Sequence, residues 1–214
     1  MYEFEAIVIL AATFIIIYII GAFRNRKLLV KYSRLIKRQV QSISEYTGFR
    51  PLGSNGFRAL ANMKEETPLS KLEIAVSLVD RENVMHYPLS ILTKERDRVT
   101  MWAFPRAKPS FSLEITPNTG NPSQNRPAGL NLTDTPIDQE DLKRTFLMAS
   151  SNKRKAGEVI SDDEITSKLL RARDFLGYLL IDEKDSRIFL TGRLTEESLG
   201  PLIDLVVASG EKIL

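Results

Sequence analysis

The longest apolar run of the chain lies near its start. Residues 6–23 carry no charged side chain, and as a helix they would measure about 27 Å at a rise of about 1.5 Å per residue. This length is close to the hydrocarbon thickness of a bilayer, about 30 Å. The run offers no polar side to solvent, which argues against a core helix of a soluble domain. The pattern predicts that residues 1–23 form a short tail and a single transmembrane helix.

A second apolar pattern follows, and it predicts a basic amphipathic juxtamembrane helix over residues 24–47. Apolar side chains recur at steps of three and four residues, with Lys and Arg on the other side, and Gly48 would end the helix. The apolar positions are Leu28, Tyr32, Leu35, Ile36, Val40, Ile43 and Tyr46. Two interpretations stay open: a helix that binds anionic lipid or RNA, and a stalk whose apolar side packs on its own domain.

Residues 48–214 have the pattern of an α+β domain of antiparallel strands with packed helices. A turn-rich connector, residues 51–60, leads into a β-rich lobe at about 68–116. Strands are expected at 72–79, 98–104 and 111–116, and residues 82–93, interrupted by Pro88, would supply an edge strand or two short pieces. In the third strand, apolar residues alternate with polar ones, which predicts one buried and one wet face.

A loop at about 117–136 separates this lobe from a helix and strand lobe at about 137–214. Residues 105–136 hold six of the ten prolines, so the loop is interpreted as mobile, with a binding loop as the alternative. The pattern of the second lobe predicts a helix near 138–143, a strand from 146, and a helix from the capping box at Ser161 to about Arg171. Strands at 175–181 and 187–194 and a final helix from about Leu199 complete the domain.

Charge gives the apolar helix an orientation. Only Glu3 and Glu5 precede it, whereas seven basic residues follow it without an acid: Arg24, Arg26, Lys27, Lys31, Arg34, Lys37 and Arg38. The positive-inside rule then places the N-terminus outside and the domain in the cytoplasm. The membrane would be the cell membrane of a prokaryote or the endoplasmic reticulum of a eukaryote. A cleaved signal peptide would need a basic n-region and a small-residue cleavage site, which are missing.

Counting the charges of residues 1–38 and 39–214 separately changes the meaning of the net charge of +3. Residues 39–214 contain 23 basic and 25 acidic residues, so the domain is slightly acidic. This argues against a general nucleic-acid binder, except through the juxtamembrane segment. The chain has no cysteine, which excludes disulfides and thiol catalysis.

The sequence predicts no catalytic, cofactor or metal site and no small-molecule substrate. His86 is the only histidine, so no histidine-based triad can form, and it is interpreted as a partly buried strand residue. Trp102 and Phe104, two apart on one predicted strand, are expected to face the same side and to belong to the core. The candidate site that remains is the set of seven basic residues, facing membrane or ribosome. An enzyme is not expected.

The order of elements resembles the calumin family, single-span coiled-coil domain proteins of the endoplasmic reticulum. The segments that carry the resemblance are FIIIYIIGAFRNRKLLVKYSRLIKRQ, DRVTMWAFPRAKPS, GEVISDDEITSKLL, RIFLTGRL and LGPLIDLVVASGEKI. The family's C-terminal coiled coil has no counterpart here. The family also has a helix after the first strand of its first lobe, where this chain has a short segment interrupted by Pro88.

The resemblance implies a non-enzymatic factor that assists membrane-protein insertion or folding at the Sec translocon, as a subunit of a membrane complex. Its implied partners are a multi-span membrane protein, the translocon and the ribosome. The alternative, from another functional class, is a membrane-surface scaffold or adaptor that binds anionic lipid through its basic stalk.

Overall fold

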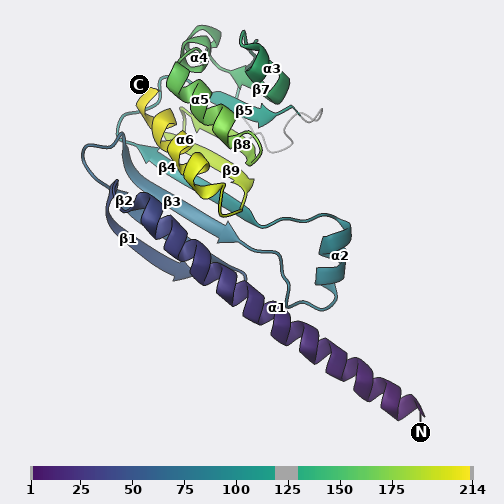
Figure 1. The fold of residues 1–214 in the computed structure, drawn as a ribbon. Helices are drawn as coiled ribbons and strands as arrows, with labels where there is room; N and C mark the ends of the chain where they lie inside the picture. The colour runs from purple at the N-terminus through teal and green to yellow at the C-terminus, as the bar shows by residue number, and fades with distance from the viewer. Residues whose placement is uncertain (1, 119–129, 213–214) are drawn as a thin grey trace.

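The computed structural model describes residues 2–118 and 130–212, which form one long helix and an α+β domain (Figure 1). The helix, α1 (Tyr2–Val40), projects far beyond the domain at its N-terminal end. All strands of the described residues belong to one antiparallel sheet, which has nine strands. The α+β class and the antiparallel pairing agree with the sequence prediction.

The N-terminal half of α1 stands free of the rest of the molecule. The helix is long and apolar enough to cross a membrane, and almost none of its apolar window is buried against other described residues. This exposure excludes the role of a core helix within the chain. The predicted apolar segment and the predicted basic segment are therefore parts of one unbroken helix.

The helix ends at Val40, earlier than the predicted boundary at residue 47. The next residues form β1 (Ser44–Pro51), which pairs in a hairpin with β2 (Gly56–Met63). Of the predicted connector, only residues 52–55 form a turn, where Gly53 has a φ of +72°, and residues 56–60 belong to β2. Tyr46, which continued the helical pattern, lies on β1, because pairing with β2 satisfies the backbone and outweighs the local helical period.

The sheet joins the two predicted lobes into one layer. Its order is β1-β2-β3-β4-β9-β8-β5-β7-β6. The remaining strands are β3 (Leu69–Ser77), β4 (Arg98–Pro105), β5 (Leu113–Pro117), β6 (Thr133–Asp134), β7 (Phe146–Ser150), β8 (Leu176–Asp182) and β9 (Arg187–Arg193). Strands β4 and β5 are consecutive in sequence, yet β9 and β8 lie between them. Of the predicted loop at 117–136, residues 119–129 lie outside the described residues.

Two expectations about strand faces are wrong. β5, an interior strand between β8 and β7, is buried on both faces, including Glu114. Trp102 and Phe104 do share a face of β4, but the core face carries Val99 and Met101. The ring of Trp102 packs on the opposite face against Phe189, with 5.8 Å between ring centroids.

The helices of the domain differ from the prediction mainly in the segment after β3. Residues 82–93 contain α2 (His86–Leu92) and not a strand. Pro88 is tolerated there because it lies in the first turn, where a missing backbone N–H breaks no helical hydrogen bond. The side chain of Asn83 accepts hydrogen bonds from the backbone N–H groups of Met85 (3.1 Å) and His86 (3.0 Å) at the start of this helix.

The other helices are α3 (Glu140–Thr145), α4 (Lys153–Ile160), α5 (Asp163–Ala172) and α6 (Leu199–Lys212). Helix α4 was not predicted from the sequence. The cap of α5 is Asp162 and not Ser161: its side chain accepts from the backbone N–H groups of Glu164 and Ile165. The final helix begins at Leu199 as predicted.

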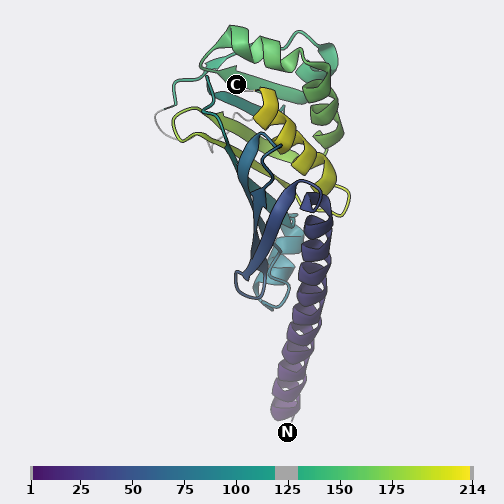
Figure 2. The same ribbon diagram turned by 90° about the vertical axis from the view of Figure 1, so that its left-hand side faces the viewer.

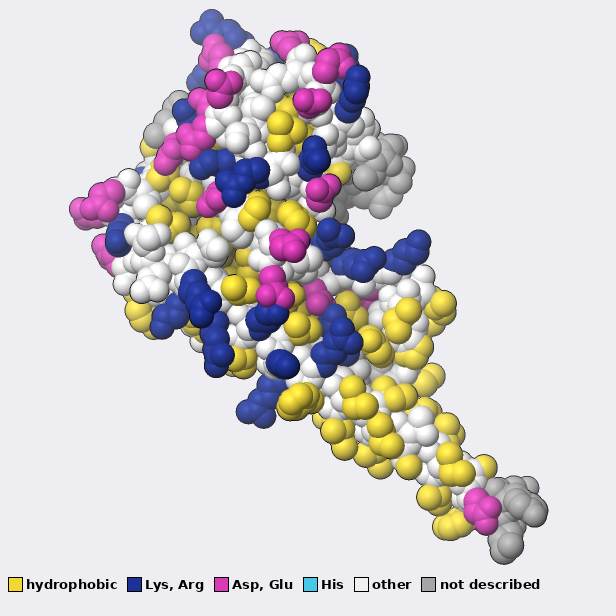
Figure 3. Space-filling model, in the orientation of Figure 1, with side chains coloured by type: hydrophobic (Ala, Val, Ile, Leu, Met, Phe, Trp, Pro, Cys, Tyr) yellow, Lys and Arg dark blue, Asp and Glu magenta, His cyan; other side chains and the backbone are white. Residues whose placement is uncertain are grey.

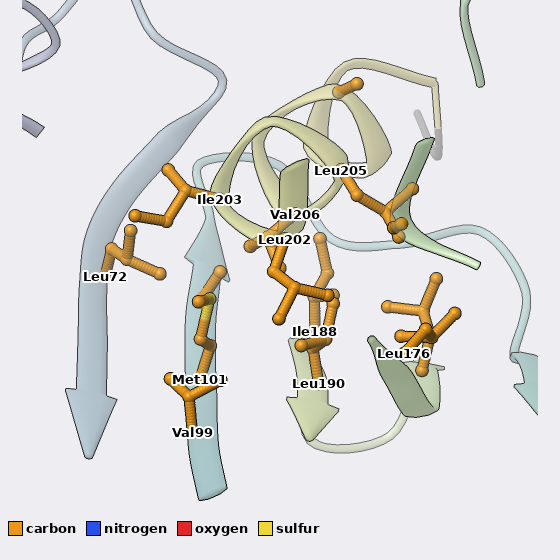
Figure 4. Close-up of a cluster of buried hydrophobic side chains, with 14 of the residues drawn as sticks. Leu72, Val99, Met101, Leu176, Ile188, Leu190, Leu202, Ile203, Leu205 and Val206 are labelled. Carbon is orange, nitrogen blue, oxygen red and sulfur yellow. The ribbon is translucent and has the colours of Figure 1, made fainter. Parts of the chain in front are cut away.

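One face of the sheet holds the main core. Helix α6 lies across β4 and β9, and its apolar side chains meet those of the strands (Figure 4). The side chains labelled there are Leu72, Val99, Met101, Leu176, Ile188, Leu190, Leu202, Ile203, Leu205 and Val206. The C-terminal half of α1 contacts β1, β2 and α6 on the same side, beside α6 (Figure 2). The packed half of α1 is thus part of the domain core.

Candidate functional site

The junction between the free and packed halves of α1 begins at Gly21. A Cβ atom at this position would lie 2.0 Å from the backbone carbonyl oxygen of Arg81, in the segment between β3 and α2. The helix can approach this backbone so closely only because glycine has no side chain. Gly21 therefore marks the level at which the domain first touches the helix.

Asn25, one turn further along α1, is completely buried. Its Nδ2 donates to Oδ1 of Asn55 (2.9 Å) and to the carbonyl oxygen of Val79 (3.1 Å), and its Oδ1 accepts from Nη1 of Arg81 (3.0 Å). Nη2 of Arg81 forms an ion pair with Oδ2 of Asp97 at 2.8 Å. We call these five residues the Asn25 network. It ties α1 to the β1–β2 turn, to the end of β3 and to the segment before β4.

Apolar packing continues this attachment along the helix. Tyr32, Ile36 and Val40 are buried against the domain, so the sequence interpretation in which the stalk packs on its own domain is correct for this side. Burial raises the pKa of the Tyr32 phenol above its ordinary value, and the nearby carboxylates of Asp97 and Glu196 act in the same direction. The phenol therefore stays neutral at physiological pH.

All seven predicted basic residues of α1 are exposed. Lys and Arg side chains gather where the apolar part of α1 meets the domain (Figure 3). Among the described residues, Lys31 is the one member of this basic face with an acidic partner, Glu196. The positive charge of the other six is not neutralised by a salt bridge within this part of the chain.

The structure brings five of the seven together around an open groove of about 670 Å³. These five are Arg26, Lys27, Lys31, Arg34 and Arg38. Phe23, Val30 and Leu35 supply apolar surface between them, and Glu196 closes one side. Arg24 instead lines a separate cavity of about 230 Å³ beside α2, and Lys37 lines neither. The basic groove combines charge and apolar surface, as sites for anionic amphiphiles do.

The basic face is also spread along the helix axis. At about 1.5 Å per residue, Arg24, Arg26 and Lys27 lie within about 6 Å of Phe23, whereas Arg34 and Arg38 lie about 17 and 22 Å from it. A surface potential at physiological salt falls off over about 8 Å. A charged layer at the level of Phe23 would therefore attract the first group strongly and the second group weakly.

Two further expectations from the sequence concern His86 and metal ligands. His86 lies on α2, where its Nε2 is 3.4 Å from Oε2 of Glu95, and it is not the strand residue that was predicted. Within residues 2–118 and 130–212, no group of three His, Asp or Glu side chains is arranged to hold a metal ion.

Gly21, Asn25, Arg81 and Asp97 were not predicted from the sequence. The sequence signal was weak: one glycine at the end of the apolar run and one uncharged polar residue within the basic run. The partners of Gly21 and Asn25 lie at least 30 residues away in sequence, so no local pattern could have identified these contacts.

Comparison with known proteins identifies no family. No protein-family model matches the chain, and no curated protein matches it. Among solved structures, a match is the crystal structure of the mycobacterial trehalose monomycolate transport factor A, TtfA. The match is 12% identical, covers 84% of this chain and 90% of that chain, and has a TM-score of 0.40. A likeness at this level carries no argument about the fold or function of this chain.

The contact at Gly21 can be tested with a matched pair of helical glycines. Gly21→Ala should lower the free energy of unfolding by about 1–3 kcal/mol, because the new methyl group must displace the Arg81 backbone. Gly157→Ala in α4, where no atom lies within 4 Å of the added Cβ, should raise it by about 0.5–1 kcal/mol. Denaturant unfolding of the full chain in detergent micelles measures both. Equal effects of the two substitutions would contradict the close contact.

Proposed function

We propose that this chain is a single-pass membrane protein without enzymatic activity, whose cytoplasmic domain is a scaffold that binds anionic lipid through the basic face of α1. The observation that carries the proposal is the continuity of α1. Its apolar half runs without a break into the half that the Asn25 network and the core hold against the sheet. A domain attached in this way keeps a defined orientation to the membrane in which the helix is anchored.

The position of the charges supports lipid as the first ligand. With the apolar run of residues 6–23 in the bilayer, Arg24, Arg26 and Lys27, the lower group, lie at the level of the headgroups. Each basic residue near an anionic membrane surface contributes about 1 kcal/mol. A typical tilt of about 20° changes these heights little. Arg34, Lys37 and Arg38, the upper group, lie beyond the headgroup layer.

Two charge-matched variants test the lipid assignment. Replacing the lower group with glutamine (Arg24→Gln, Arg26→Gln, Lys27→Gln) should reduce the enrichment of anionic phospholipid bound to the protein, by about fivefold per residue if each contributes about 1 kcal/mol. The same replacement in the upper group removes three charges as well, but should leave the enrichment close to that of the unchanged protein. Lipids that copurify from a mixed phosphatidylcholine and phosphatidylglycerol membrane are quantified. Equal losses in both variants would refute the lipid assignment.

The absence of cysteine allows a direct test of orientation. Single substitutions Glu5→Cys and Lys108→Cys place one thiol on each side of the proposed span, and both positions are exposed. In intact cells, a membrane-impermeant maleimide should label the first variant and should label the second only after permeabilisation. The reverse pattern would place the domain outside.

A second candidate is the factor for membrane-protein insertion or folding at the Sec translocon that the calumin resemblance implies. The upper group favours it, because these charges lie too far from the bilayer to bind lipid well and are free for an acidic partner such as ribosomal RNA.

Affinity purification from detergent-solubilised membranes separates the two candidates. If the second holds, the unchanged protein should recover translocon or ribosome components, and the upper-group variant should lose them while it keeps its lipid enrichment. Recovery of no translocon, ribosome or insertase component by the unchanged protein would leave the scaffold as the function.

A further inference from the structure

Helix α2 presents an uncovered apolar surface. Four of its side chains or immediate neighbours are largely exposed: Met85 (75%), Leu89 (57%), Ile91 (62%) and Leu92 (78%). Outside α1, the described residues expose eight large apolar side chains, and these four lie within eight consecutive positions. Scattered apolar residues on a surface need no explanation, but a cluster on one short helix indicates a contact.

The cluster lies at the level where the apolar half of α1 meets the domain. The segment that leads into α2 contains Arg81, whose backbone touches α1 at Gly21. Figures 1 and 2 both show α2 beside the middle of α1, at the end of the domain from which the free half of the helix projects. In Figure 3 apolar surface continues from the free half of α1 to the neighbouring edge of the domain where α2 lies. Any bilayer that surrounds the apolar half of α1 therefore reaches α2.

Basic side chains line a cavity next to this apolar surface. Arg24 of α1, together with Lys94 and Arg96 that follow α2, lines the cavity of about 230 Å³ beside the helix. Tyr87 and Ser90 also line it, as does one acid, Glu95, which pairs with His86. Segments that lie in the membrane interface combine exposed apolar side chains with nearby cations. The cations of such segments meet lipid phosphates.

We infer that α2 enters the interface of the same bilayer that holds α1, with Met85, Leu89, Ile91 and Leu92 at the acyl boundary and Arg24, Lys94 and Arg96 at the headgroup phosphates. The inference rests on the proposed membrane anchoring of α1. It adds a second contact, so the domain touches the membrane at two points and its tilt relative to the bilayer is restricted. A protein partner on α2 is the competing occupant, and lipid is favoured by the continuity with α1 and by the basic residues behind the patch.

Fluorescence from single labelled cysteines in full-length protein tests the inference, since the chain has no cysteine of its own. The protein is reconstituted in vesicles of phosphatidylcholine and phosphatidylglycerol without any partner. Leu92→Cys carries an environment-sensitive dye at the tip of α2, and its high exposure makes the substitution harmless to folding. Phe14→Cys reports on the free half of α1, and Arg154→Cys on α4 is an exposed control at the far end of the domain.

The dye at position 92 should emit at shorter wavelength than the dye at 154, lose its emission to a lipid-borne nitroxide, and resist aqueous iodide. The dye at position 14 should behave as a lipid-embedded probe, and the dye at 154 as a water-exposed one. Iodide quenching at 92 with lipid quenching at 14 would overturn the role of α2 while the anchor stands. Iodide quenching at both positions would overturn the anchor and the role of α2 together.

Discussion

The buried amide of Asn25 is the contact on which the relation between helix and domain depends. A buried amide needs partners for its N–H and C=O groups, and leaving a buried polar group unpaired costs about 1–3 kcal/mol. Here Asn55 supplies a partner from the β1–β2 turn, and Val79 and Arg81 supply partners from the segment before α2, so the polar groups are satisfied only when α1 and these two segments are assembled together. Asp97 in turn fixes Arg81 through their ion pair. Packing of Ile36 and Val40 buries apolar surface between the helix and the domain, whereas the Asn25 network fixes the register of the helix on the domain.

The continuous sheet gives this attachment a rigid base. Strand β5 leaves the first lobe and pairs between β8 and β7 of the second, while β4 pairs with β9, so neither lobe has a complete sheet alone. Helix α6 covers β4 and β9 at this seam, and the packed half of α1 lies beside it. The contact between α1 and the β1–β2 turn therefore orients the whole domain relative to α1.

The same helix carries two kinds of surface along its length. Its apolar positions face the domain from Tyr32 to Val40, and its cations face solvent over a distance of about 21 Å from Arg24 to Arg38, at about 1.5 Å per residue. Because electrostatic attraction to a membrane decays within about a Debye length, charges that look equivalent in sequence differ in what they can reach. The basic face therefore divides into a group suited to lipid and a group suited to a partner above the membrane.

The apolar run of residues 6–23, the basic residues after it and the α+β class were predictable from sequence, because hydropathy and periodicity are local properties. The strands β8 and β9 and the helix α6 were also predicted, since β8 is a short apolar run, and β9 and α6 each bury one face with a regular period. The hairpin of β1 and β2, the burial of β5 on both faces, the face of Trp102 and the helix at Pro88 were not. The first three depend on pairing or packing with other segments: β2 converts the end of a helical pattern into a strand, and β5 pairs with β7 and β8 in the interior of the sheet. The sequence by itself determined which residues are apolar, which are charged and in what order they follow. Only the tertiary structure decided that Asn25 holds α1 to the domain and that α2 lies beside it, because those contacts join residues at least 30 positions apart.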